Sequence, residues 1–316
     1  MVADEAPVLA LSGGVGGAKL ALGLYRLLPP DTLTVVANTG DDFEHLGLSI
    51  CPDLDTLLYT LSGQANPELG WGREGETWTF MAALEKLGGE TWFRLGDGDL
   101  ATHVERTRRF AAGESLTGII DNFRRRYGIA ARLLPMSDDP VRTFIDSDRG
   151  RLDFQDYFVR LRSEPPVRSL SFAGSETARP QPDFLAALAD PNLRAIVVCP
   201  SNPLISIGPI LSLPGVREAL RDSPAPVVAV SPIIGGKAIK GPTAKMMAEL
   251  GMQADAAAVA RHYRDFLDLY IADEADRDAV AGLDLPVVLG PTLMVTLEDR
   301  EGLARLVLAA ADELRR

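Results

Sequence analysis

The sequence predicts an α/β fold with a mainly parallel sheet, because short apolar runs alternate with helical patterns along the chain. Each apolar run is followed by Gly, Asn, Ser or Pro, and the runs occupy residues 8–11, 33–37, 195–199, 227–230 and 286–289. Strands covered by helices on both faces form continuous apolar runs of this kind. Helical patterns lie between several of them, at residues 18–28, 216–220 and 256–267. This order predicts a Rossmann-like, doubly wound arrangement.

Residues 74–162 differ from the rest of the chain, because helical patterns dominate this stretch. The patterns occupy residues 76–87, 100–112, 116–127 and 154–161. In the last of them, Phe154, Tyr157, Phe158 and Leu161 recur at the spacing of a stripe that faces a core. We therefore predict a Rossmann-like core of residues 1–73 and 163–316, with a mainly helical insertion of residues 74–162.

The charge balance excludes one class of partner. The 316 residues include 44 acidic and 32 basic side chains, a formal charge of −12, which repels nucleic acid. Two cysteines are too few for a disulfide framework, and no apolar run approaches the ~18 residues that span a bilayer. Residues 1–10 lack the basic segment of a secretory signal. We expect a cytoplasmic globular enzyme without membrane contact.

A glycine-rich turn follows the first predicted strand and leads into a helical pattern. Its residues are Gly13, Gly14, Val15, Gly16, Gly17 and, after Ala18, Lys19. Glycines let a backbone approach an anion closely, and a helix N-terminus offers free N–H groups and partial positive charge. The turn therefore predicts a phosphate site, and a tight turn without a ligand is the alternative.

Two common phosphate signatures fail at identifiable positions of this turn. The dinucleotide pattern G-x-G-x-x-G would require glycine where Lys19 stands. The P-loop requires Ser or Thr after its lysine, where this chain has Leu20. Neither a nicotinamide dehydrogenase nor a P-loop hydrolase is favoured.

Four carboxylates follow the second predicted strand. Asp41 and Asp42 follow this strand after Asn38-Thr39-Gly40. Asp53 and Asp55 come soon afterwards, after Cys51-Pro52. Ligands in a parallel sheet collect outside the carboxyl ends of the strands, where these side chains would lie beside the glycine turn. Carboxylates together with substrate phosphate are a usual magnesium site. The alternative is that Asp53 and Asp55 only cap a helix.

Further polar loops are expected on the same rim. Ser201, Asn202 and Pro203 follow one predicted strand, and residues 231–237 follow another. In the insertion, Arg94 precedes His103, and Met136 follows a further strand-like run. Trp71 and Trp78 are candidates to flank a flat ring, whereas His103 could equally be structural.

Together these motifs resemble the 2-phospho-L-lactate transferases of coenzyme F420 biosynthesis, which include the bacterial phosphoenolpyruvate-type enzymes. The matching segments run in order over most of the chain. They are Gly13-Gly-Val-Gly-Gly-Ala-Lys19, Asn38-Thr-Gly-Asp-Asp42, Pro52-Asp-Leu-Asp-Thr56, Leu95-Gly-Asp97, Ala101-Thr-His103, Leu134-Pro-Met-Ser-Asp-Asp-Pro140, Ser201-Asn-Pro203 and Ser231-Pro-Ile-Ile-Gly235.

The resemblance implies a magnesium-dependent transfer. The ribityl hydroxyl of the deazaflavin Fo would attack the phosphorus carrying the lactyl or enolpyruvyl group of a guanosine-diphosphate-linked donor, and GMP would leave. It also implies a Rossmann-like core, an insertion that contributes to the Fo site, and a homodimer. The donor could carry phospholactate, phosphoenolpyruvate or phosphoglycerate, and the sequence leaves this choice open.

The resemblance also assigns roles to residues. The glycine turn and Ser201–Pro203 would hold the nucleotide and its phosphates. Asp55, Arg94 and Met136 would contact Fo, Asp41, Asp42 and Asp53 would bind Mg²⁺, and Asp55 and Asp42 would be catalytic, with Asp55 orienting or deprotonating the attacking hydroxyl. The alternative function is a nucleotide-sugar-binding regulator of the gluconeogenesis-factor type, which resembles this family in its core.

Overall fold

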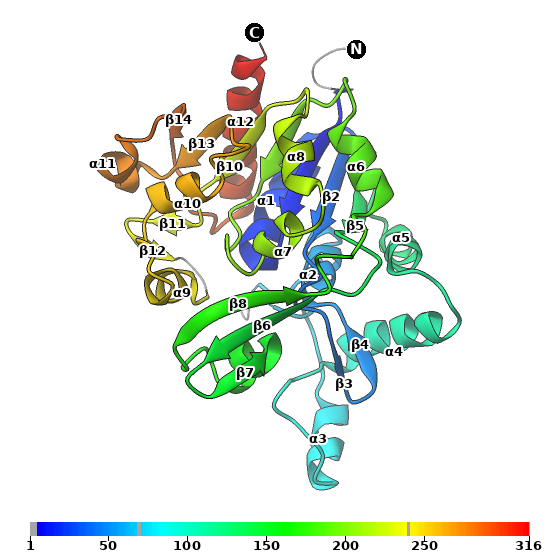
Figure 1. The fold of residues 1–316 in the computed structure, drawn as a ribbon. Coiled ribbons are helices and arrows are strands. Elements are labelled where there is room, and N and C mark those ends of the chain that lie inside the picture. Colours follow the sequence, from blue (N-terminus) through cyan, green and yellow to red (C-terminus); the bar gives the residue numbers. More distant parts are fainter. Residues whose placement is uncertain (1–4, 68–70, 239–240, 316) are drawn as a thin grey trace.

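A computed structural model describes residues 5–67, 71–238 and 241–315 of the chain. Its centre is a seven-stranded sheet in which every neighbouring pair is parallel (Figure 1). In spatial order the strands are β14 (Val287–Leu289), β13 (Leu269–Ala272), β10 (Val227–Val230), β9 (Ala195–Val198), β1 (Val8–Ser12), β2 (Leu33–Ala37) and β5 (Arg132–Pro135).

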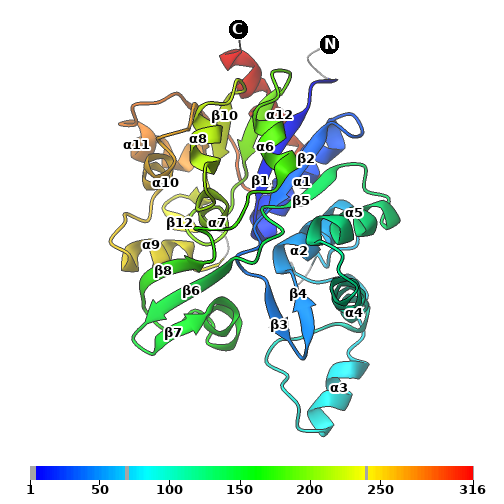
Figure 2. The same cartoon turned by 45° about the vertical axis from the view of Figure 1, so that its right-hand side comes forward.

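Helices cover both faces of this sheet, and each face has its own apolar core. One core joins alternate side chains of the strands to helices α1 (Gly14–Leu27), α2 (Pro52–Leu61), α5 (Leu116–Arg126) and α12 (Leu297–Leu314). The other joins them to helices α6 (Pro182–Leu188), α7 (Gly208–Leu211), α8 (Val216–Arg221), α9 (Thr243–Glu249) and α10 (Ala256–His262). Figure 2 shows the sheet between the two layers. The predicted α/β, Rossmann-like doubly wound fold is confirmed.

Smaller elements lie beyond the carboxyl ends of the central strands (Figure 1). They are the hairpin of β3 (Phe43–His45) and β4 (Leu48–Ile50), the antiparallel sheet of β6 (Arg142–Ser147), β7 (Gly150–Asp153) and β8 (Val167–Ala173), and helices α3 (Thr79–Lys86) and α4 (Asp97–Ala111). A π-helix, η2 (Asp156–Arg160), follows β7. The remaining short elements are β11 (Ile233–Ile234), β12 (Lys237–Ala238), the 3-10 helix η3 (Glu274–Asp276) and α11 (Arg277–Val280).

The division into a core and an insertion of residues 74–162 stays a prediction. Within that stretch the structure shows three α-helices and one π-helix, but also β5, which pairs with β2 in the central sheet. It also shows β6 and β7, which form a separate antiparallel sheet with β8. Chain segments on both sides of residue 162 therefore share one sheet.

Three expected elements differ from the structure. Helix α1 begins at Gly14, so that most of the glycine turn forms its first turn. Helix α10 ends at His262 rather than at residue 267, because the chain turns there and buries Tyr263 and Phe266 against each other. In place of the predicted helix at 154–161 there is a shorter π-helix at Asp156–Arg160. Phe154, just before it, and Tyr157, within it, are buried, whereas Phe158 is exposed.

Candidate functional site

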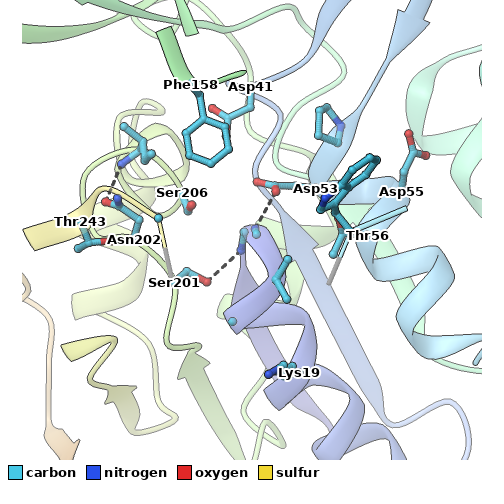
Figure 3. A pocket seen from close by; sticks show the side chains of 18 of the residues that line it. Lys19, Asp41, Asp53, Asp55, Thr56, Phe158, Ser201, Asn202, Ser206 and Thr243 are labelled. Atoms are coloured by element: carbon cyan, nitrogen blue, oxygen red, sulfur yellow. Dashed lines mark hydrogen bonds between the residues drawn. The ribbon is translucent and has the colours of Figure 1, made fainter. Parts of the chain in front are cut away.

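A large cavity of about 670 Å³ lies at the carboxyl ends of the central strands. Its walls come from the loops after β1, β2, β9, β10 and β14, and from α2, α4, η2 and residues 92–94. Figure 3 shows one part of it, with the start of α1 facing Asp53 and Ser201. The predicted glycine, carboxylate and Ser-Asn motifs therefore meet at one site.

The start of helix α1 is already bonded to side chains from distant segments. The Gly13 amide donates to Ser201 Oγ at 3.1 Å, and the Gly14 amide donates to Asp53 Oδ1 at 2.7 Å. The other oxygen of Asp53 accepts from Asn38 Nδ2 at 2.9 Å. No side-chain hydrogen bond caps α2, so the capping alternative for Asp53 is not supported.

The glycines of this turn serve packing as well as any ligand. A Cβ on Gly16 would lie 2.5 Å from the Pro200 carbonyl oxygen, and one on Gly17 would lie 2.4 Å from Ser12 Oγ. These contacts require glycine, because heavy atoms do not approach so closely. Gly17 is buried and does not line the cavity, so its expected contact with the nucleotide stays a prediction without support from its position.

Two carboxylates, Asp41 and Asp53, line the cavity beside α1. Burial raises the pKa of Asp53 to about 6. Burial and then the charge of Asp53 raise the pKa of Asp41 well above its usual value. Asp41 Oδ1 is buried without a hydrogen-bond partner among the described residues. Two desolvated carboxylates that repel each other favour a bound cation.

Asp42 lies apart from this pair. It lines a second, smaller cavity of about 230 Å³, with Arg142 and Thr143, and does not line the main one. Burial raises its pKa to about 7, an effect that Arg142 opposes. The expected place of Asp42 in the metal and catalytic set stays a prediction, which its position outside the main cavity does not support.

Asp55 lies on α2 at the other end of the cavity, where it is paired with the fully buried Arg106 of α4. Arg106 Nη1 donates to Asp55 Oδ2 at 3.1 Å and Nη2 donates to Oδ1. Burial opposes the charge of Arg106, but the Asp55 carboxylate outweighs it and raises the pKa of Arg106. Both oxygens of Asp55 are thus fixed in place by a permanent cation.

Asp99 and His103 of α4 extend this polar cluster. Arg106 Nη1 lies 3.2 Å from His103 Nδ1, and because guanidinium can only donate, Nδ1 accepts. His103 Nε2 then lies 3.2 Å from Asp99 Oδ2, and Tyr59 donates its hydroxyl to Asp99 Oδ1 at 2.6 Å. The ligand atoms of Asp55, Asp99 and His103 lie within 4.8 Å of one another. A metal is not needed there, because Arg106 already supplies the positive charge.

Aromatic rings line the cavity opposite α1. Trp92 and Phe93 pack edge to face at 5.8 Å, and Phe158 stacks on Phe154 at 5.4 Å with an interplanar angle of 12°. Arg94 also lines the cavity, with its guanidinium 4.0 Å from the centre of the Trp78 ring. Such a wall is suited to a flat conjugated ring.

Two other residues with expected ligand contacts, Met136 and Pro203, do not line the cavity, and their roles stay predictions. Met136 is fully buried in the core beneath β5 and does not line the cavity, because the backbone of this strand end is bonded to β2. Pro203 is also buried away from the cavity, although Ser201 and Asn202 line it. Trp71 lines the cavity, whereas Trp78 only supports Arg94.

Several lining residues were missed by sequence reasoning. Ser206 follows the Ser-Asn-Pro motif by three residues, and its side chain lies against Gly13. Trp92 and Phe93 directly precede Arg94, so an aromatic pair beside an arginine was an available signal. Arg106 does not line the cavity but holds Asp55, and the sequence gives no sign of this role, because an arginine on a charged helix normally faces solvent.

No helix within residues 5–67, 71–238 and 241–315 is long and apolar enough to cross a membrane.

Comparison with curated proteins finds close relatives over nearly the whole chain. A phosphoenolpyruvate transferase of Kitasatospora aureofaciens is 43% identical, over 98% of this chain and 98% of its own. A phosphoenolpyruvate transferase of Streptomyces coelicolor is 41% identical over 98% and 99%, and one of Mycobacterium tuberculosis is 39% identical over 96% and 98%.

Among solved structures, a UPF0052 family protein of Bacillus halodurans superposes with a TM-score of 0.64 over 96% of this chain and 99% of that one. At 13% identity this likeness shows the fold alone. The family model described as 2-phospho-L-lactate transferase CofD matches residues 8–283, which contain the central strands from β1 to β13 and most of the cavity wall. The chain therefore belongs to the 2-phospho-L-lactate transferase family.

Proposed function

We propose that this protein transfers a phospholactyl or phosphoenolpyruvyl group from a guanosine-diphosphate-linked donor to the ribityl hydroxyl of Fo, with release of GMP, in coenzyme F420 biosynthesis. The names of the curated relatives favour the phosphoenolpyruvyl donor. A cytoplasmic homodimer stays a prediction of the resemblance.

One observation carries the proposal. The same cavity joins a helix N-terminus with two carboxylates, Asp41 and Asp53, to an aromatic wall with a fixed carboxylate, Asp55. The end at the helix N-terminus is suited to bind a pyrophosphate. The aromatic end is suited to bind a flat ring that carries a polyhydroxyl chain. A volume of about 670 Å³ is within the range of ligand sites for molecules of nucleotide size.

The charges on the cavity wall support a divalent cation. Besides Asp55, which Arg106 neutralises, the described cavity wall carries three carboxylates, Asp41, Asp53 and Asp99, and two cations, Lys19 and Arg94. A pyrophosphate donor would bring further negative charge, so binding requires a counter-charge that these side chains do not supply. We propose that Asp41 and Asp53 hold Mg²⁺ together with donor phosphate oxygens.

The bonds that change are the same for either donor. The Fo hydroxyl oxygen forms a bond to the phosphorus that carries the organic acid, and the bond from this phosphorus to the oxygen of the GMP phosphate breaks. GMP takes the bonding pair, and the hydroxyl proton leaves with solvent or a nearby oxygen. Mg²⁺, when bound, spreads the charge that develops on the phosphate oxygens.

This chain's own residues position the reactants. Ser201, Asn202 and the first turn of α1 would bind the donor's phosphates and ribose. Asp55, whose orientation is fixed by Arg106, would accept a hydrogen bond from the attacking hydroxyl and aim it at phosphorus. Trp92, Phe158 and Arg94 would bind the deazaflavin ring.

The test is mass spectrometry of purified protein incubated with Fo, Mg²⁺ and each guanylylated donor in turn, with the Fo adduct and GMP measured together. We expect equal amounts of adduct and GMP with one donor. Asp55→Asn should lower turnover by about a hundredfold, as loss of a positioned polar group does. Asp138→Asn is the matched control. The Asp138 carboxylate is exposed and accepts a hydrogen bond from Thr117 outside the cavity, so turnover should stay unchanged.

Absence of an adduct with every donor, from folded protein with Mg²⁺ present, would refute the transferase. Tight binding of a nucleotide sugar in that case would support the regulatory protein instead.

A further inference from the structure

The anion position at the start of α1 is taken by the protein's own Asp53. The Gly14 amide, the first of the helix, donates to Asp53 Oδ1 at 2.7 Å. Asn38 Nδ2 holds the second oxygen at 2.9 Å, and the residue is only 6% exposed. A helix N-terminus attracts phosphate through its free amides and partial positive charge. Here the Asp53 carboxylate occupies one of these amides and offsets part of the positive charge.

We propose that Asp53 is a gate for the donor: its carboxylate keeps anionic phosphates away from α1 until a divalent cation neutralises it. This inference rests on the proposed function, and deepens it by setting the order of binding, with the cation before or together with the nucleotide.

The neighbouring charges strengthen the gate. Asp41 lines the same cavity as Asp53, and its Oδ1 is buried without a hydrogen-bond partner among the described residues, so two carboxylates face an incoming phosphate. Lys19, in the second turn of α1, donates to the Met294 carbonyl oxygen at 2.6 Å. Figure 3 shows Lys19 further along the helix, away from Asp53. Without a cation, this end of the cavity therefore repels the ligand for which its backbone is arranged.

The experiment measures GDP affinity by calorimetry at pH 8, with EDTA and with saturating Mg²⁺. Wild-type protein should bind GDP at least about tenfold more weakly in EDTA, a factor within the range that like charges about 4 Å apart produce. Asp53→Asn keeps an oxygen acceptor for the Gly14 amide but removes the charge. It should bind GDP in EDTA about tenfold more tightly than wild type, and respond little to Mg²⁺.

The metal-free affinity of the variant separates the gate from simple metal ligation. If Asp53 were only a magnesium ligand, Asp53→Asn would weaken binding in Mg²⁺ and leave binding in EDTA unchanged. Asp183→Asn is the matched control, because it removes the same charge from an exposed carboxylate paired with Arg132, and both affinities should stay as in wild type. Thermal unfolding of each variant confirms that it is folded.

Asp53→Ala removes the whole carboxylate from the start of α1, and it should show the same gain in GDP affinity in EDTA. No gain in EDTA with either variant would overturn the gate, as would equal GDP binding by wild type in EDTA and in Mg²⁺. Failure of wild type to bind GDP in any condition would instead overturn the nucleotide site itself, and the proposed function with it.

Discussion

Replacing Arg106 by methionine removes the cation that holds α4 against α2. The guanidinium is fully buried, and its loss leaves the Asp55 carboxylate, which is 5% exposed, without its two hydrogen bonds. The Ser49 carbonyl and His103 Nδ1 lose their donor as well. Breaking a buried pair by removing one partner costs about 3–5 kcal/mol, because the other charge stays desolvated.

This cost converts to a measurable shift in Tm. At about 2.1 cal/mol/K per residue, the unfolding entropy of 316 residues is about 0.7 kcal/mol/K, so Tm should fall by about 5–8 °C. Arg108→Met is the control, because Arg108 is an exposed residue of the same helix that pairs with Glu105, and its loss should cost less than about 0.5 kcal/mol.

A second variant tests the physical reason. Arg106→Met combined with Asp55→Leu removes both charges and should recover most of the lost stability, since an apolar pair of similar volume suits a buried site. Differential scanning calorimetry measures all three proteins. Equal Tm values for Arg106→Met and Arg108→Met would refute the role given to the buried pair.

Three further predictions concern other parts of the site. Burial raises the pKa of Asp42 from 3.8 to about 7, so its contribution to stability is full below pH 3.8 and is lost as pH rises through 7. Asp42→Asn should therefore flatten the fall in Tm between pH 5 and pH 8 in EDTA, and an unchanged slope would contradict this. Gly17→Ala should lower Tm, since its Cβ would meet Ser12 Oγ at 2.4 Å, whereas Gly302→Ala on α12, with open space around it, should raise stability by about 0.5–1 kcal/mol in denaturant unfolding. Phe158→Ala should raise KM for Fo about tenfold with little change in kcat, and an unchanged KM would remove Phe158 from the ring site.

The central fold could be predicted because burial on both faces leaves a plain sequence signal. The runs at β1, β2, β9, β10 and β14 are almost entirely apolar, and Thr34 of β2 is half-buried. Strand β13 was missed, because its run follows directly on a helical pattern without a turn signal. The position of β5 in the same sheet depends on pairing with β2, about 100 residues earlier in the chain, which periodicity cannot reveal.

The site was predictable where backbone chemistry decides it. Glycines at a strand-to-helix turn and polar residues after parallel strands must meet at one rim, and Gly14, Asp53 and Ser201 do so. Side-chain direction was not predictable. Asp41 and Asp42 are adjacent, yet Asp41 lines both cavities whereas Asp42 lines only the smaller one, where its neighbours come from β6 and α4, which are distant in sequence.

The most direct test of the proposed site is a crystal structure of the protein with GDP, Fo and Mg²⁺ bound together. We expect the GDP phosphates at the start of α1, the cation between Asp41 and Asp53, and the Fo ring between Trp92 and Phe158 with its ribityl chain at Asp55. Nucleotide bound away from α1, or Fo outside this cavity, would contradict it.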